Sequence, residues 1–166
     1  GLENGPLCVQ AFYREGEGLA VCEAAGRIFG YEHELVTLGS GLSVEELLID
    51  CVYDQPAAKA RVLAHSPLFA THAAGLYFHG HDGDVADTSS IDELGALPDV
   101  VEYRPYYRPG DTISHERGAK PYVVRYYVTG PSRESVDSLS RTIMDQASVL
   151  DPDGNELLLR TTATAC

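Results

Sequence analysis

The chain has few basic side chains and no long hydrophobic run. Its 12 Lys and Arg residues stand against 25 Asp and Glu residues, giving a formal net charge of −13. Such an excess of negative charge repels phosphodiester backbones and anionic lipid headgroups, so we expect neither nucleic acid nor a membrane as a partner. No apolar stretch approaches the roughly 20 residues of a membrane-spanning helix, and no cleavable leader is recognisable. These absences predict a cytoplasmic protein.

Cysteine is also scarce, and its spacing excludes further classes of protein. The four cysteines lie at positions 8, 22, 51 and 166, without a Cys-x-x-Cys pair. This scatter predicts reduced thiols rather than a disulfide framework or a sulfur-bound metal. No Gly-x-Ser-x-Gly elbow is present, and neither Cys8 nor Cys22 has neighbours that would activate its thiol. The sequence therefore gives no support to a serine or cysteine nucleophile.

Two short apolar segments, 9–13 and 19–22, flank the sequence REGEG, which is typical of a hairpin turn. A two-residue turn inside REGEG pairs Gln10 either with Val21 or with Glu23, depending on which two residues form it. In both registers Gln10 and Glu23 share a face, because opposed residues of an antiparallel pair point the same way. A bulge or an odd-length turn would remove this relation.

Helix and strand signals alternate along the rest of the chain. Residues 34–38 predict a helix that ends at Gly39-Ser40-Gly41, and the capping-box spacing of Ser43 and Glu46 predicts a second that ends before Gln55-Pro56. Ser132 predicts the start of a last helix that continues to about Leu150. Strands are expected over residues 68–79, after the turn at 82–87, and over 100–107, 121–128 and 156–161. The pattern predicts an α+β fold.

Glu23 lies at the end of an apolar strand, and Arg27 follows four residues later. A carboxylate supplies the hard oxygen that Mg²⁺ prefers, and a guanidinium supplies a planar fork for phosphate oxygens. Gly26 would let the backbone turn sharply between them. The two residues therefore suit a pocket that holds a cation and an anion together. The alternative interpretation is an exposed Glu-x-x-x-Arg ion pair, which is common and contributes little.

The order of motifs adds a resemblance to a known family. The run GPLCVQAFYREGEGLAVCEAAGRIFGYEHELVTLGSGLSVEELLIDCVYD resembles the C-terminal half of an ATP-grasp domain, of the kind found in amino-acid ligases and other carboxylate–amine ligases related to carbamoyl-phosphate synthase. Glu23 and Arg27 match the ends of that family's Glu-x-Asn-x-Arg motif. Residues 66–149, with AGLYFHG, ELGALPDVVEY, RPGDTI and VVRYYVTGPSRESVDSLSRTI, are similar to the small C-terminal domain of those ligases.

The resemblance implies a division of the chain and a reaction. Residues 1–55 would be the C-terminal portion of an ATP-grasp lobe, an antiparallel hairpin with helices. Residues 56–166 would form a small, mostly antiparallel sheet domain with one long helix. The implied reaction is an ADP-forming ligation, in which ATP phosphorylates a carboxylate and an amine then displaces phosphate from the acyl phosphate.

The resemblance also implies roles for three residues. Glu23 would be a metal ligand and a cofactor-binding residue, holding the Mg²⁺ that bridges the phosphates of ATP. Arg27 would be a catalytic and cofactor-binding residue, stabilising charge on the transferred group, and Gln10 would complete the metal shell. Two departures weaken the expected metal binding: Gln10 stands where the family has an acid, and Ala25 stands where its motif has Asn.

A preceding lobe, with the lysines that hold the triphosphate, is implied by the resemblance and is not in this sequence. The chain begins as if in mid-domain and has no initiator Met. We therefore expect a fragment that is inactive alone. Its expected partners are the missing N-terminal lobe and small-molecule carboxylate and amine substrates, with a homodimer left open.

Two other functions stay open at this point. The chain could be a non-catalytic binding or dimerisation module that kept the fold, an interpretation that Gln10 and Ala25 favour. It could also be a small metal-dependent enzyme, because HGHDGD places His79 and His81 on one face of a strand with two aspartates close by. The alternative interpretation of that segment is an ordinary polar turn between strands.

Overall fold

The structure is a computed structural model that describes residues 5–28, 30, 32–66, 68–116 and 122–160. The chain forms two compact units, Gly1–Ala70 and Thr71–Cys166, which are described separately below. The sequence predicted a domain boundary between residues 55 and 56, which lies at the start of a helix in the first unit. That boundary stays a prediction. Within the described residues, every helix is too short or too polar to cross a lipid bilayer.

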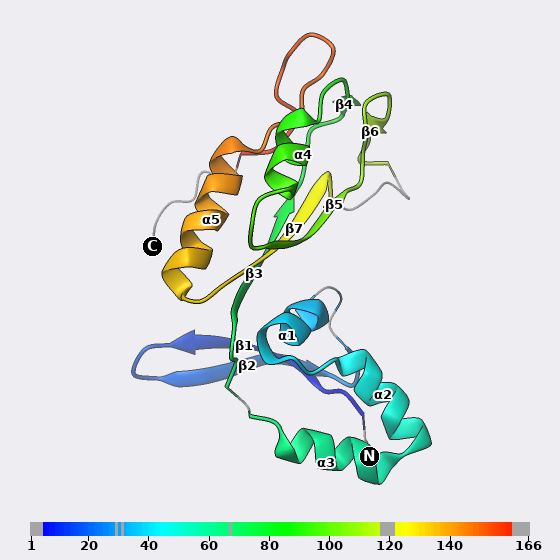
Figure 1. The fold of residues 1–166 in the computed structure, drawn as a ribbon, viewed down its shortest axis with the longest axis vertical. Helices are drawn as coiled ribbons and strands as arrows, with labels where there is room; N and C mark the ends of the chain where they lie inside the picture. Colours follow the sequence, from blue (N-terminus) through cyan, green and yellow to red (C-terminus); the bar gives the residue numbers. More distant parts are fainter. Residues whose placement is uncertain (1–4, 29, 31, 67, 117–121, 161–166) are drawn as a thin grey trace. The chain divides into compact units, whose positions relative to one another are not determined.

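The first unit consists of one antiparallel hairpin and three short helices (Figure 1). The hairpin predicted from REGEG is confirmed, as are the first two helices. The elements, in chain order, are β1 (Cys8–Arg14), β2 (Gly18–Ala25), α1 (Glu32–Ser40), α2 (Val44–Tyr53) and α3 (Gln55–Ala64). Helix α3 was not expected from the sequence.

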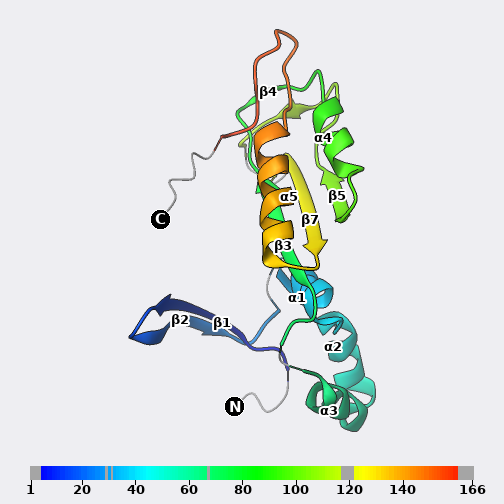
Figure 2. The same ribbon diagram turned by 60° about the vertical axis from the view of Figure 1, so that its left-hand side comes forward.

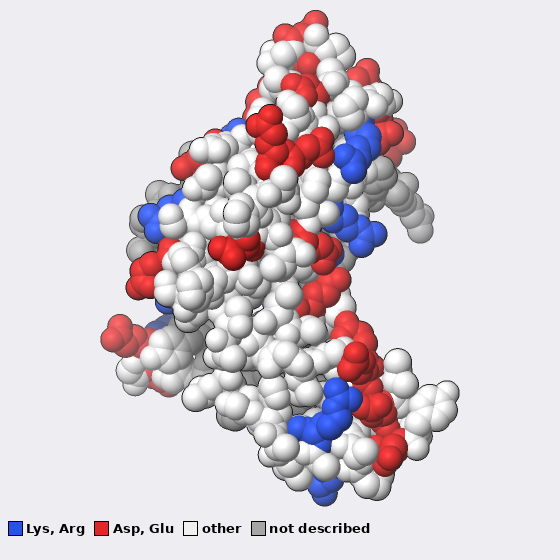
Figure 3. Space-filling model, in the orientation of Figure 1, with Lys and Arg blue, Asp and Glu red and all other residues white. Residues whose placement is uncertain are grey.

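Capping side chains set the starts of α2 and α3. The Ser43 hydroxyl accepts a hydrogen bond from the Glu46 amide at 3.2 Å, as the spacing predicts. The Asp54 carboxylate accepts one from the Ala57 amide at 3.1 Å, and Pro56 lies in the first turn of α3, where a missing amide hydrogen costs nothing. The chain therefore leaves one helix and begins the next at once. Figure 3 shows basic side chains beside acidic ones over this pair of helices.

The second unit is built on a three-stranded antiparallel sheet in the order β3-β7-β5, with a two-stranded pair β4-β6 nearby (Figure 2). This confirms the expected small, mostly antiparallel unit with one long helix. Its elements are β3 (His72–Phe78), β4 (Gly83–Asp84), α4 (Ser89–Gly95), β5 (Val100–Pro105), β6 (Thr112–Ile113), β7 (Val124–Gly130) and α5 (Arg133–Gln146). The short helix α4 was not expected.

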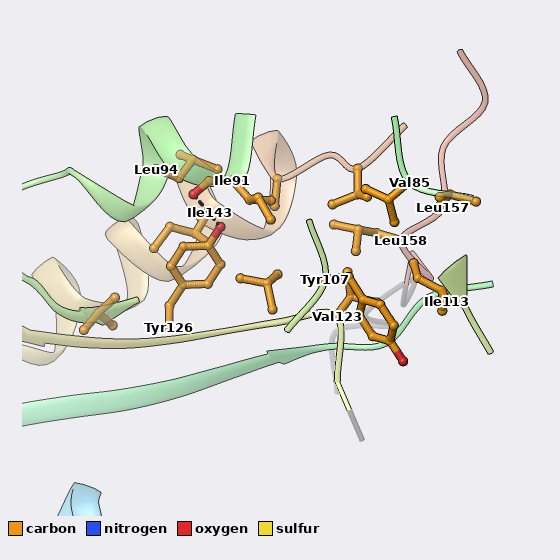
Figure 4. Close-up of a cluster of buried hydrophobic side chains, with 14 of the residues drawn as sticks. Val85, Ile91, Leu94, Tyr107, Ile113, Val123, Tyr126, Ile143, Leu157 and Leu158 are labelled. Atoms are coloured by element: carbon orange, nitrogen blue, oxygen red, sulfur yellow. Dashed lines mark hydrogen bonds between the residues drawn. The ribbon is translucent and has the colours of Figure 1, made fainter. Parts of the chain in front are cut away.

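The hydrophobic core lies between one face of this sheet and helices α4 and α5 (Figures 2 and 4). On the central strand β7, Val124, Tyr126 and Val128 point to the helices and are completely buried. The Tyr126 hydroxyl donates a hydrogen bond to the Ile91 carbonyl of α4 at 3.1 Å. The Tyr103 ring of β5 stacks on Tyr126 at 5.4 Å between centroids. These contacts fix β5 and β7 against helix α4.

Helix α5 begins as the sequence predicts, and the chain after it differs from the prediction. Ser132 is the N-cap, and it exchanges two hydrogen bonds with Ser135, each of 3.2 Å, in a capping box. The strand predicted at 156–161 is wrong over its described part. Isolated bridges are formed there instead, Leu150 with Glu156 and Gly80 with Leu158. Residues 161–166 lie outside the described part of the chain.

Candidate functional site

The register of the β1–β2 hairpin decides where the predicted site residues lie. Gln10 and Glu23 are directly opposite each other, as one of the two predicted registers requires. The turn is nevertheless of odd length, because Arg14 pairs with Gly18 and leaves three residues between them. Its Gly16 has a positive φ of 79°, which favours glycine, and the Glu17 amide donates to the Arg14 carbonyl at 3.0 Å.

A bulge restores the pairing that the odd turn would remove. The register shifts between Gln10 and Ala11: Ala11 pairs with Val21, but Gln10 pairs with Glu23, so Cys22 is the additional residue. Without this bulge, Gln10 would lie opposite Cys22, and Glu23 would point to the other face. The predicted common face of Gln10 and Glu23 is thus confirmed, through two irregularities that offset each other.

The two faces of the hairpin differ in chemistry because side chains alternate along each strand. One face, called the polar face below, carries Gln10 and Glu23, with Phe12 nearer the turn. The opposite face, called the apolar face below, consists of Val9, Ala11, Tyr13, Leu19, Val21 and Ala24. Most of its large side chains are strongly exposed, with Tyr13 at 73% and Leu19 at 74%. Both faces of the hairpin are therefore exposed among the described residues from Val9 to the turn, whereas Cys8 at its base is completely buried.

Arg27 lies next to Glu23, immediately beyond the end of β2. A guanidinium nitrogen of Arg27 is 3.9 Å from a Glu23 carboxylate oxygen, and the side chains are 56% and 51% exposed. The same guanidinium donates a hydrogen bond to the Ile28 carbonyl at 3.2 Å. The attraction between two exposed charges at this distance is weak, so either side chain can turn to another partner. The carboxylate oxygens and the guanidinium both stay accessible to a ligand.

The donor set on the polar face fits part of a magnesium shell. Glu23 offers a carboxylate oxygen and Gln10 an amide oxygen from the opposite strand, and both are hard ligands. Mg²⁺ in proteins is commonly held by one or two carboxylates together with substrate phosphates and water. Among the described residues, no three His, Cys, Asp or Glu side chains converge as a metal site. The pair on the hairpin would therefore need phosphate oxygens to complete a shell.

A shallow, open hollow of about 400 Å³ runs along β1 and includes Gln10. Val9, Ala11, Phe12 and Cys22 line the rest of it. Cys22, the bulge residue, was not a candidate in the sequence, and no sequence signal marks a bulge at this position. The hollow does not include Glu23 or Arg27. It offers contact area beside the polar face rather than an enclosed pocket.

The HGHDGD segment does not assemble into a metal site within the described residues. The His79 ring packs against Tyr122 at 5.1 Å between centroids. Asp82 contacts the Nδ1 atom of His115, and Asp84 accepts a hydrogen bond of 2.6 Å from the Thr112 hydroxyl. The amide of His81 donates to the Leu157 carbonyl at 2.7 Å. The residues of this segment therefore have separate partners.

Comparison with known proteins shows the fold. No family model and no curated protein matches the sequence. An L-amino acid ligase from Bacillus licheniformis shares the fold with a TM-score of 0.70 and 17% identity, over 91% of this chain and 37% of the ligase chain. A phosphoribosylglycinamide synthetase from Anaerococcus prevotii shares it with a TM-score of 0.63 and 13% identity, over 87% of this chain and 36% of the synthetase chain.

Both neighbours are ATP-grasp ligases, so the resemblance seen in the order of the motifs is confirmed at the level of the fold. The hairpin with helices and the antiparallel unit that follows are a part of that larger fold. The chain spans about 37% of the length of the first neighbour.

Proposed function

We propose that this chain is part of an ATP-dependent, ADP-forming ligase that joins a carboxylate to an amine through an acyl phosphate. The observation that carries the proposal is the meeting of Gln10, Glu23 and Arg27 at one end of the hairpin, in a fold shared with two ligases. An acid, an amide oxygen and a guanidinium at one place are suited to a divalent cation and to phosphate oxygens.

Each of the three residues would have a distinct part in phosphoryl transfer. Glu23 and Gln10 would hold Mg²⁺ from opposite strands, and the bound ion would neutralise charge on the phosphates. Arg27, beside Glu23, would orient the oxygens of the transferred group and stabilise its charge. The hairpin would contribute by fixing these side chains relative to one another, since catalysis of this kind depends mainly on positioning and charge neutralisation.

The proposal includes partners outside this chain. An N-terminal lobe would supply the lysines that hold the triphosphate, and the chain alone would be inactive. The apolar face of the hairpin and its two unpaired strand edges would be covered by such a lobe, since an isolated two-stranded hairpin is marginally stable. The substrates would be a small carboxylate and a small amine, in the cytoplasm.

A second candidate is a non-catalytic binding or dimerisation module with the same fold. The neutral Gln10 in place of an acid, and Ala25 in place of the motif's Asn, favour it, because the first weakens a metal ligand and the second removes a metal or phosphate ligand. The apolar face of the hairpin favours it as well: Val21 is 66% and Leu19 74% exposed, so a second copy of this chain would gain by covering them.

Titration calorimetry with ATP and Mg²⁺ tests the first proposal on the longer protein that includes the missing lobe. We expect Glu23→Gln to weaken Mg²⁺-dependent ATP binding by about tenfold or more, because Glu23 is the charged one of the two metal ligands proposed on the described hairpin. Glu17→Gln is the matched control, since Glu17 lies at the turn of the same hairpin and pairs with Arg14 at 2.9 Å. A titration of ATP in the presence of a chelator measures the ATP affinity without Mg²⁺, and the difference from the first titration gives the metal-dependent contribution to binding.

Unchanged ATP affinity and turnover in Glu23→Gln would remove Glu23 from the site. Absence of nucleotide binding by the wild type, together with a concentration-dependent dimer in sedimentation, would favour the dimerisation module instead.

A further inference from the structure

The three-stranded sheet of the second unit has two edges, and only one of them is protected against pairing with another strand. At the protected edge, β5 carries the charged side chains of Glu102 and Arg104 and ends at Pro105, and its register shifts between Val100 and Glu102. Charged residues, proline and bulges are the usual features that keep an edge strand from pairing with a second molecule. The β5 edge is therefore closed to further strands.

The other edge strand, β3, has none of these features. Its seven residues, HAAGLYF, include no Asp, Glu, Lys, Arg or Pro, and its register with β7 is regular from His72 to Phe78. The chain as a whole has a net charge of −13, so most of its surface repels a second copy. At the neutral β3 edge, two copies can approach without one acidic side chain of the strand facing another.

Two hydrogen bonds at the end of β3 show which backbone groups face away from β7. The Phe78 carbonyl accepts from the Val123 amide, just before β7, at 2.7 Å. The carbonyl of the next residue, His79, accepts from the Leu159 amide at 2.9 Å, on the opposite side of the strand. The outer side of β3 is therefore the side to which the His79 carbonyl points.

Ala73 and Gly75 present their backbone groups on this outer side. Backbone groups alternate in direction along a strand, so the N–H and C=O of these two residues point the same way as those of His79. Among the described residues, the sheet ends at β3, and no strand pairs with Ala73 or Gly75 on that side. Their donors and acceptors are therefore available to an added strand.

An open apolar hollow lies beside this edge. It has a volume of about 380 Å³ and extends along residues 75–79, and Met144 of α5 and Leu159 line the rest of it. These two side chains are 38% and 41% exposed, so apolar surface next to the edge is in contact with water. A strand added to β3 would cover this surface in addition to bonding the backbone.

The sequence of β3 is complementary to itself when two copies run antiparallel about Gly75. In that register Gly75 lies opposite Gly75 of the second copy, where neither strand has a side chain, and their outward N–H and C=O groups face each other. Ala74 then lies opposite Leu76, and Ala73 opposite Tyr77, of the second copy. A small side chain meets a large one at each of these positions, which favours a second copy of this chain as the occupant of the edge.

We propose that two copies of this chain associate through β3, antiparallel about Gly75, to form one continuous sheet in the order β5-β7-β3-β3-β7-β5. The interface uses the same strand on both copies, and the protected β5 edges lie outermost, so the assembly stops at a dimer. The inference does not rest on the ligase function proposed above, because β3 and the hollow belong to the second unit. It applies equally to a ligase and to a non-catalytic module.

Sedimentation velocity of the full chain over a range of concentrations tests this proposal. We expect a monomer–dimer equilibrium whose dissociation constant rises about tenfold or more in Ala73→Pro, because proline removes an outward-facing donor and leaves the bonds to β7 in place. Val101→Pro is the matched control: Val101 lies at the bulge of β5 and pairs with no residue of β7, so this variant should dimerise as the wild type does. Leu19→Ser, on the apolar face of the hairpin, should also leave the dimer unchanged.

Hydrogen exchange gives a second measurement on the unmodified chain. The amides of Ala73 and Gly75 should exchange more slowly at high protein concentration than at low concentration, because the second copy accepts their hydrogen bonds. Ala74 and Leu76 point toward β7 and should be protected at both concentrations, so they are controls within the same strand. This alternating pattern decides the question even where Ala73→Pro fails to fold.

Three outcomes would overturn the proposal. The first is a chain that stays monomeric at every concentration. The second is a dimer that persists in Ala73→Pro, with circular dichroism showing that the variant is folded, or that is lost in Leu19→Ser alone, which would place the interface on the hairpin. The third is exchange at Ala73 and Gly75 that does not change with concentration. ATP binding at the hairpin is measured separately, so each of these outcomes leaves the ligase proposal as it stands.

Discussion

Replacing Ile143 with alanine is expected to lower the free energy of unfolding of the second unit by about 3 kcal/mol. Ile143 is completely buried on the side of α5 that faces the sheet, where Tyr126 and Val128 of β7 also lie. Truncation removes its contacts and leaves a cavity that the surrounding core cannot fully close. Urea denaturation followed by circular dichroism, with hydrogen exchange of the β7 amides to identify the unit, measures the loss.

Met144→Ala is the matched control for this change. Met144 is the next residue of the same helix and is 38% exposed, so its truncation should cost well under half as much as that of Ile143. Equal losses in the two variants would mean that α5 presents a different side to the sheet from the one described.

Stability is expected to fall steeply above about pH 10, because the pKa of the Tyr126 phenol is raised by burial and further by the nearby Asp92 charge. Burial also raises the pKa of Tyr103, as does its hydrogen bond to Asp92 at 2.6 Å. Below pH 10 both phenols are protonated in the folded and unfolded chain, so stability does not change on their account. Above it, the unfolded chain loses these protons first, which favours unfolding until the folded pKa is reached.

The expected slope is about 1.4 kcal/mol per pH unit for the buried Tyr126 phenol and smaller for the half-buried Tyr103. Tyr126→Phe should remove its share of the slope, while costing about 1 kcal/mol at neutral pH through the lost bond to the Ile91 carbonyl. Tyr53→Phe, at a side chain that is 86% exposed, should leave the profile unchanged. Denaturation curves between neutral and alkaline pH give the slopes. An alkaline limb that is identical in wild type and Tyr126→Phe would contradict the assignment.

The elements that the sequence predicted are those whose signals are local. Ser132 predicts the start of α5, because an N-cap signal belongs to the helix itself, whereas the predicted end near Leu150 lies beyond the observed end at Gln146. REGEG predicts the hairpin for the same reason. The resemblance to ATP-grasp ligases, which the shared fold confirms, depended on motif order over nearly the whole chain.

Helices α3 and α4 were not predicted, because the first has an ambiguous start signal and the second has no side-chain capping bond. Pro56 indicated the end of a helix, but with Asp54 as N-cap it lies in the first turn of α3, where proline is tolerated. The N-cap Thr88 of α4 forms no side-chain capping bond, so no capping signal marked that short helix. The strand expected at 156–161 is rich in leucine, yet its described residues form only isolated bridges. Whether these segments form helices, strands or isolated bridges depends on tertiary packing, which cannot be inferred from the periodicity of the sequence.

The candidate site was predictable in its residue types and only partly in its geometry. The sequence named Gln10, Glu23 and Arg27, and the structure places Glu23 opposite Gln10 and beside Arg27. Why Gln10 and Glu23 face the same way could not be read from the sequence, since a turn of odd length and an inserted Cys22 each reverse the facing.

The paired irregularities of the hairpin restrict how its length can change. Deleting Cys22 would remove the bulge and leave Glu23 opposite Gln10, whereas closing the bulge with Cys22 retained would place Cys22 opposite Gln10 and turn Glu23 toward the side occupied by Val9 and Tyr13. Homologues that keep the acid opposite position 10 should therefore either have both the bulge and its additional residue or lack both.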